Sequence, residues 1–161
     1  MIYAGIGSRE TPNSVLSQMQ EWGNYFARTE CVLRSGHARG ADMAFELGCD
    51  SALPGHHAKQ IFTADMSMRN PTWFEHAAKF HPAWLKCSPQ ARALHARNSA
   101  IVLGAMLDAP VNFIICWTKD GKASGGTGQA LRIAVSYEIP VFNFQSDAQM
   151  DALRQFLTSR R

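Results

Sequence analysis

Apolar residues along this chain of 161 residues fall into short continuous runs, separated by longer segments of helical periodicity. Short apolar runs bounded by turn residues are typical of buried strands. The runs cover residues 1–6, 31–35, 57–63, 111–117 and 140–144. The fourth run is interrupted only by Asn112, so it predicts a central parallel strand that is covered on both faces.

The segments between these runs carry apolar residues three and four positions apart, as in helices that pack one face on a sheet. They cover approximately residues 15–26, 41–52, 90–107, 127–137 and 148–157. In the second of these helices we expect Met43, Ala44 and Leu47 to face the core. Alternating strands and helices predict parallel strands joined by right-handed crossovers. The expected fold class is α/β: a single doubly wound domain over residues 1–161, with a mostly parallel sheet of about five strands flanked by helices.

Residues 64–89 interrupt this alternation. The segment holds several aromatic and methionine side chains among prolines and polar residues. It predicts a short helix over residues 72–79 and irregular chain elsewhere. Long connections in compact domains are often functional or packed by their own aromatics. We expect a packed lid or an oligomer contact here, with direct contact to a ligand as the alternative.

The composition favours a compact globular protein, because 46% of the residues are hydrophobic and only 18% are charged. The net charge of +3 permits an anionic ligand, but it is far too small for a chain that coats nucleic acid by charge alone.

The four cysteines are widely spaced and form no CxxC pair, which favours reduced thiols and a cytoplasmic location. The chain begins with a strand pattern and no signal region. No apolar run approaches the roughly 20 residues that cross a bilayer, so no membrane partner is expected.

Three glycine-bearing turns follow three of the predicted strands, at residues 5–9, 35–40 and 124–128. Loops at the carboxyl ends of strands in a doubly wound sheet share one edge, where ligands bind. The turns are therefore expected to meet at one crevice. Glycines let a ligand approach the backbone closely. They can instead be present only because they permit tight strand–helix packing or a positive φ angle. The candidate ligand-binding glycines are Gly7, Gly36, Gly40, Gly125 and Gly126.

Hydroxyl and guanidinium groups in the same turns are suited to phosphate or ribose oxygens. The candidates are Ser8, Arg9, Ser35, Arg39, Ser124 and Thr127. Arg34 and His37 add charge at the second turn, and the helix that follows offers free N–H groups and a favourable dipole. The second turn is therefore expected to cradle an anion.

Asp42 lies just inside that helix, where it can stabilise the helix dipole or accept a hydrogen bond from a sugar hydroxyl. Glu46 shares its helix face, and we expect it to be solvated. Arg97 and Asn98 on the helix over residues 90–107 are further candidate site residues. The histidines lack a carboxylate or cysteine partner at ligand spacing, so no metal site and no cofactor are expected.

Two common nucleotide motifs are absent. Position 10 is Glu10 where the dinucleotide fingerprint that begins at Gly5 needs a glycine, and the turn at 36–41 lacks the lysine of a Walker loop. Hydride transfer and nucleoside triphosphate hydrolysis are therefore disfavoured.

The turns resemble a known family in their order and sequence. Gly5-Ile6-Gly7-Ser8-Arg9 and Ser35-Gly36-His37-Ala38-Arg39-Gly40-Ala41-Asp42, followed by Ala96-Arg97-Asn98 and Ser124-Gly125-Gly126-Thr127-Gly128, are similar to the Rossmann-like domain of the DprA/Smf DNA-processing proteins. The broader superfamily includes the LOG phosphoribohydrolases. The resemblance implies a Rossmann-like domain whose glycine turns bind nucleotide or nucleic-acid phosphates, and it implies a homo-oligomer.

One departure bears on catalysis. LOG enzymes carry paired glutamates after the glycine motif, whereas this chain reads Gly125-Gly126-Thr127-Gly128-Gln129-Ala130-Leu131-Arg132 and has no acid until Glu138. Binding is therefore favoured over cleavage, and whether the protein is an enzyme is left open. The leading hypothesis is a protein that binds a nucleotide or nucleotide-derived phosphate ligand. The alternatives are a DprA-like protein that binds single-stranded DNA and a nucleotide N-glycosidase.

Overall fold

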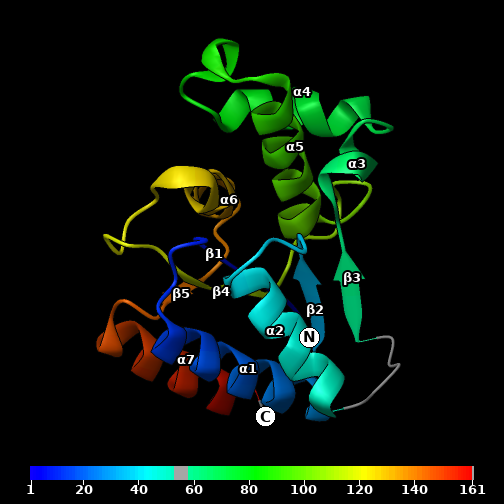
Figure 1. Ribbon diagram of the computed structural model, residues 1–161. Helices are drawn as coiled ribbons and strands as arrows, with labels where there is room; N and C mark the ends of the chain where they lie inside the picture. The colour runs from blue at the N-terminus through cyan, green and yellow to red at the C-terminus, as the bar shows by residue number, and fades with distance from the viewer. Residues whose placement is uncertain (53–57, 161) are drawn as a thin grey trace.

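The computed structural model describes residues 1–52 and 58–160 (Figure 1). Its strands are β1 (Ile2–Gly7), β2 (Val32–Ser35), β3 (Lys59–Ile61), β4 (Phe113–Trp117) and β5 (Val141–Asn143). Its helices are α1 (Asn13–Arg28), α2 (Ala41–Ala52), α3 (Ala64–Ser67), α4 (Pro71–Phe80), α5 (Pro89–Leu103), α6 (Gly125–Ser136) and α7 (Asp147–Thr158), with a 3₁₀ turn η1 (Trp84–Lys86). All five predicted strands are present, although His57, where the third was expected to begin, lies outside the described residues.

The strands form one parallel sheet in the order β3-β2-β1-β4-β5. The chain builds outward from β1 to β3 and then returns to place β4 on the other side of β1. Gly7 at the end of β1 is paired with Trp117 at the end of β4. The order therefore reverses between β1 and β4, which is where doubly wound sheets bind ligands. The predicted α/β fold class is confirmed.

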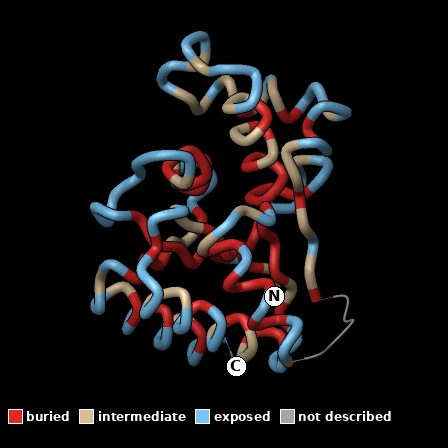
Figure 2. Tube along the Cα trace, viewed as in Figure 1, coloured by how far each residue is buried: buried red, intermediate tan, exposed pale blue. Residues whose placement is uncertain are grey.

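Helices cover both faces of the sheet, and its central strands β1 and β4 are buried along most of their length (Figure 2). Tyr3, Leu33 and Phe113 pack with α1, α2 and α7 on one face. Ala4 and Ile114, next in sequence to two of these, pack with α4, α5 and α6 on the other. Because alternate residues of a strand point to opposite faces, β1 and β4 each contribute to both cores.

The core-facing side of α2 differs from the prediction. Met43 and Leu47 are 37% and 54% exposed, whereas Phe45 and Cys49 are buried. The helix lies against α1 so closely that a side chain at Gly48 would strike the backbone of Gln20. With α2 packed in this way, the buried face of the helix carries Phe45 and Cys49 instead of the expected Met43 and Leu47.

The segment from α3 to η1 is more ordered than expected. Pro71 begins α4, as proline does well at a first helical position, and Trp73 is buried with its Nε1 donating to the Ala105 carbonyl at 2.8 Å. The expected helix over 72–79 is thus confirmed and slightly longer. At the other end of this region α5 stops at Leu103, because Gly104 adopts a φ of +83°, so the helix is shorter than the expected range of 90–107.

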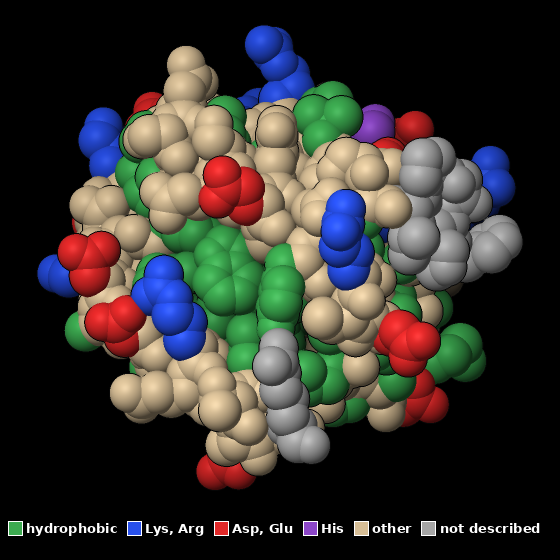
Figure 3. All heavy atoms as spheres, turned by 90° about the horizontal axis from the view of Figure 1, so that it is seen from below, with side chains coloured by type: hydrophobic (Ala, Val, Ile, Leu, Met, Phe, Trp, Pro, Cys, Tyr) green, Lys and Arg blue, Asp and Glu red, His purple; other side chains and the backbone are tan. Residues whose placement is uncertain are grey.

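A hydrophobic hollow lies on the face formed by α1 and α7 (Figure 3). Trp22, Tyr25 and Leu157 line it, and its volume is about 440 Å³. Within the described ranges, no helix has the length and apolar character that crossing a membrane requires.

Candidate functional site

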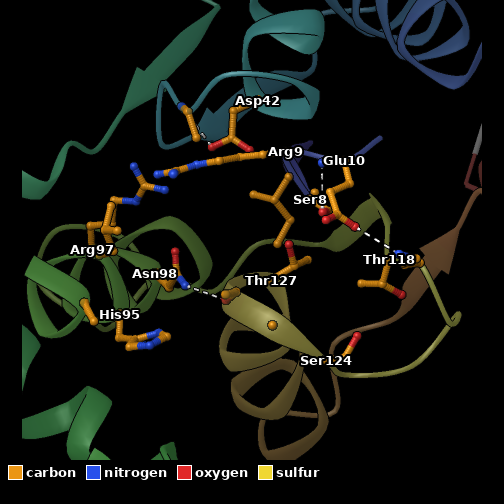
Figure 4. A pocket seen from close by; sticks show the side chains of 18 of the residues that line it. Ser8, Arg9, Glu10, Asp42, His95, Arg97, Asn98, Thr118, Ser124 and Thr127 are labelled. Atoms are coloured by element: carbon orange, nitrogen blue, oxygen red, sulfur yellow. Dashed lines mark hydrogen bonds and ion pairs between the residues drawn. The ribbon is translucent and has the colours of Figure 1, made fainter. Parts of the chain in front are cut away.

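A cleft of about 840 Å³ opens at the carboxyl ends of β1 and β4, the switch point of the sheet (Figure 4). It contains ten of the predicted site residues: Gly7, Ser8, Arg9, Asp42, Arg97, Asn98, Ser124, Gly125, Gly126 and Thr127. Sequence reasoning did not include several other residues of the lining, among them Glu10, Thr118, Lys119 and Arg132. The first and third glycine turns thus meet across one cleft, together with one face of α5.

The amino terminus of α6 points into this cleft. Gly125, Gly126 and Thr127 occupy its first turn, and Ser124 at the N-cap makes no capping hydrogen bond, since its Oγ donates to Asp120 at 2.8 Å. In the described part of the chain, the N–H groups of these three residues have no hydrogen-bond partner. The space beside the Cα atoms of Gly125 and Gly126 is open to 4 Å. Free amides at a helix N-terminus favour an anion.

Asn98 holds this helix end in position. Its Nδ2 donates to the carbonyl of Gly126 at 3.1 Å, and its side chain is buried. A comparable bond supports the start of the neighbouring loop, where Asn143 Nδ2 donates to Thr118 Oγ1 at 2.8 Å. The two asparagines therefore brace the borders of the cleft, and Asn98 holds the carbonyl of Gly126 in place.

The second glycine turn is arranged differently from the expectation. Asp42 Oδ2 accepts hydrogen bonds from the N–H groups of Gly36 at 3.0 Å and Ala38 at 3.4 Å. The carboxylate thus already occupies the position expected for a bound anion. The anion cradle expected at this turn is therefore already filled, because the turn supplies its own anion.

Burial raises the pKa of Asp42 to about 6, although Arg97 and the two amides favour its charged form. Arg97 lies over the same turn, with its Nη1 donating to the Gly36 carbonyl at 2.6 Å. A methyl group at Gly36 would lie 2.6 Å from its Cζ, so the absence of a side chain at Gly36 makes room for the guanidinium. Burial lowers the pKa of Arg97, and Arg9 lowers it further.

Two guanidinium groups therefore lie close together on one wall of the cleft. The side chain of Arg9 extends toward Arg97 (Figure 4). Arg97 Nε is buried and has no partner among the described residues. Lys119 and Arg132 add positive charge to the lining, and Glu10 is paired with Lys119 at 3.5 Å. Basic groups thus outnumber acidic ones around the cleft.

Five predicted site residues lie outside the lining, and all of them belong to the second turn. Ser35 is buried and its Oγ donates to the Gly5 carbonyl at 2.7 Å, which ties β2 to β1. Gly36 supports Arg97 as described above, and Gly40 adopts a φ of +92° against the backbone of Ser8 and Arg9. The other two are His37 and Arg39, both exposed.

Arg34 and Glu46 also differ from their predicted roles. The Arg34 guanidinium is buried, with Nη1 donating to the Ala109 carbonyl at 2.5 Å and Nε to Gln60 Oε1 at 2.7 Å. It therefore joins elements of the fold and adds no charge to the turn. Glu46 is 8% exposed instead of solvated, because it pairs with His37 Nδ1 at 2.9 Å.

The expectation that the histidines lack a cysteine partner is wrong for two of them. Cys87 Sγ lies 3.7 Å from both ring nitrogens of His81, and the rings of His81 and His95 are 4.4 Å apart between centroids. Burial, His81 and nearby arginines lower the pKa of His95 to about 4. His76 is an ordinary polar packing residue, bonded to Ser99 and Tyr137.

A parallel sheet of this strand order, with a cleft at its switch point, defines a Rossmann-like α/β protein. In three dimensions the chain is similar to DNA processing protein A from Helicobacter pylori, whose structure concerns its binding of single-stranded DNA. The TM-score is 0.59 at 19% sequence identity, and the match covers 89% of this chain. This chain spans 64% of the length of that one. No family model matches the sequence, and no curated protein matches it.

Proposed function

We propose that the cleft binds the phosphates of single-stranded DNA. The observation that carries the proposal is the meeting of the free α6 amino terminus with Arg9, Arg97 and Lys119 around one cleft. Helix amides and guanidinium groups are complementary to phosphate oxygens, and an open row of such groups suits a backbone that passes through. The shared fold with a protein that binds single-stranded DNA supports this choice of polyanion.

The lining also indicates how such a strand is recognised. Among the described residues that line the cleft there is no Phe, Tyr or Trp, the side chains on which bases usually stack. Contacts to phosphates therefore supply most of the affinity, and sequence preference is weak. Binding of this kind weakens steeply with salt, because counterions are released from the strand.

The test measures fluorescence anisotropy of a labelled oligothymidylate at several salt concentrations. Arg9→Ala and Lys119→Ala are expected to weaken binding and to flatten the slope of log K against log salt by about 0.7 for each phosphate that the removed side chain neutralises. Arg28→Ala is the matched control, since Arg28 is exposed at the end of α1, away from the cleft. Absence of binding, or equal slopes for all variants, would refute the proposal.

A free nucleotide is the second candidate. The cleft volume of about 840 Å³ lies within the range of roughly 300–1,000 Å³ that is usual for small-molecule sites. AMP or ADP-ribose that displaces the oligonucleotide at low concentration would favour this candidate. Release of free base that is abolished in Asp42→Asn would favour the N-glycosidase, because Asp42 is an acid within the cleft lining.

A further inference from the structure

Three potential metal ligands meet at the border of the cleft. They are His81 at the end of α4, Cys87 after η1 and His95 on α5. One ligand atom from each residue lies within 4.8 Å of the other two. His81 and His95 also line the cleft. The group contains both imidazole nitrogen and thiol sulfur, the donor combination that zinc prefers in proteins.

We propose that His81, Cys87 and His95 bind a Zn²⁺ ion. Zinc lies about 2.0–2.3 Å from such ligands, which places two tetrahedral ligands roughly 3.3–3.7 Å apart. The separation of 3.7 Å between Cys87 Sγ and the His81 nitrogens already matches this spacing. Small side-chain rotations bring the third ligand to the same range.

The surrounding contacts hold the ligands in place before any metal binds. Arg92 on α5 donates to the carbonyls of Trp84 at 3.2 Å and Leu85 at 3.2 Å, so the turn that carries Cys87 is tied to the helix that carries His95. Ser88 caps the same helix by accepting from the Ala91 N–H. A fixed arrangement of this kind reduces the entropy lost when the ligands close on a metal.

One unsatisfied atom of the cluster points to the same conclusion. His95 Nδ1 is buried and lacks a hydrogen-bond partner among the described residues. Such an atom is costly unless something binds it. His81 Nδ1 accepts a hydrogen bond from the Ala83 N–H at 3.1 Å. A metal bound at this nitrogen would use the same lone pair, and the N–H of the exposed Ala83 would then donate to water instead. The Cys87 thiol gives its proton to solvent as the bond to the metal forms.

Two of the three ligands line the cleft, so a fourth coordination position would lie at its border. Over residues 1–52 and 58–160 no further His, Cys, Asp or Glu joins the group. Three protein ligands leave one position for water or for an oxygen of a bound molecule, as in zinc sites that are not purely structural. The positive charge of the nearby Arg132 repels a bound Zn²⁺ ion, and the negative charge of the Cys87 thiolate offsets part of that repulsion. A metal here adds one more group that attracts a phosphate in the cleft.

Metal binding is tested on the metal-free full chain without DNA, so its outcome is independent of the proposed function. Co²⁺ serves as the spectroscopic probe for Zn²⁺. We expect one equivalent to give a thiolate-to-cobalt charge-transfer band that Zn²⁺ abolishes. Cys87→Ser should lose the band and His95→Gln should weaken it. Cys31→Ser is the matched control, since Cys31 is buried in a different part of the fold, and it should keep the band.

A second measurement uses the unaltered protein and does not depend on how a variant folds. Zn²⁺ should protect Cys87 from alkylation by iodoacetamide, as mapped by peptide mass spectrometry, by at least tenfold in rate. Absence of a charge-transfer band in the wild type, its retention in Cys87→Ser, or unchanged alkylation of Cys87 would each overturn the proposal.

Discussion

Arg97 Nη1 donates a hydrogen bond of 2.6 Å to the carbonyl of Gly36, and the guanidinium fills the space that a side chain at Gly36 would occupy. The two residues are 61 positions apart in sequence. Their contact joins the second glycine turn to α5 and directs a positive charge toward the cleft.

Gly36→Ala is therefore expected to lower both stability and ligand affinity. The added methyl group would lie 2.6 Å from Arg97 Cζ, so the guanidinium must move. Overpacking of this kind costs about 1–3 kcal/mol of unfolding free energy. Loss of a positioned arginine weakens phosphate binding by about tenfold. Urea denaturation and oligonucleotide anisotropy measure the two effects, and a variant with wild-type affinity would show that Arg97 does not contact the ligand.

Gly125 and Gly126 should respond differently to alanine, although they are neighbours at the start of α6. Gly125 has a φ of +61°, so Gly125→Ala is expected to cost about 1–2 kcal/mol through backbone strain. No atom lies within 4 Å of the side-chain position of Gly126, and its φ is not positive. Gly126→Ala should leave stability unchanged or raise it by up to about 1 kcal/mol. Because its methyl group enters the cleft, it should still weaken binding. Thermal unfolding and anisotropy of both variants test this contrast.

Arg34 is expected to be structural even though its neighbour Ser35 begins the second turn. Arg34→Met removes the hydrogen bonds to the Ala109 carbonyl and to Gln60 while keeping most of the side-chain volume. We expect a loss of about 2–3 kcal/mol in unfolding free energy. Affinity for the oligonucleotide should be unchanged in the folded variant. For comparison, Arg9→Ala is expected to lower affinity and to keep wild-type stability. If Arg34→Met lowered affinity alone and Arg9→Ala lowered stability alone, the structural role of Arg34 and the binding role of Arg9 would both be contradicted.

Asp42 should impose a pH dependence on stability. Its pKa is about 6 in the folded protein against an ordinary value of 3.8, so the folded state binds its proton more tightly than the unfolded state does. The contribution to stability is therefore fully present below pH 3.8 and is lost as the pH rises through 6. The difference amounts to roughly 3 kcal/mol.

Asp42→Asn removes this titration and keeps an oxygen that can accept from the Gly36 and Ala38 amides. Relative to this variant, the wild type should gain stability as the pH falls from 7 to 4. Denaturant unfolding of both proteins across that range gives the measurement. Parallel curves would mean that Asp42 titrates normally.

The strands and the position of the cleft could be predicted because they follow from local patterns. Apolar runs such as Phe113–Trp117 and the glycine turns after them are visible in sequence, and the topology of a parallel sheet brings those turns to one edge. Helix α3 could not be predicted, because its four residues, Ala64–Ser67, are too few to show a period.

The roles of individual side chains depended on contacts that no local pattern contains. Glu46 is buried because His37, nine residues away, lies within 2.9 Å. Asp42 is recognisable at a helix start, but its bonds to the Gly36 and Ala38 amides depend on how the turn folds back. The spacing of His81, Cys87 and His95 matches no common metal motif, since a 3₁₀ turn and a helix bring them together.

The carboxylate of Asp42 is a ligand covalently tethered beside the amides that it occupies. Tethering gives it an effective concentration in the millimolar range or higher, which a free phosphate must exceed to displace it. This competition within the chain disfavours weak anions at the second turn, whereas the described residues offer no such tethered competitor to the amides at the start of α6. Under the proposed function, a bound strand would therefore place a phosphate at Gly125–Thr127 in preference to the second turn.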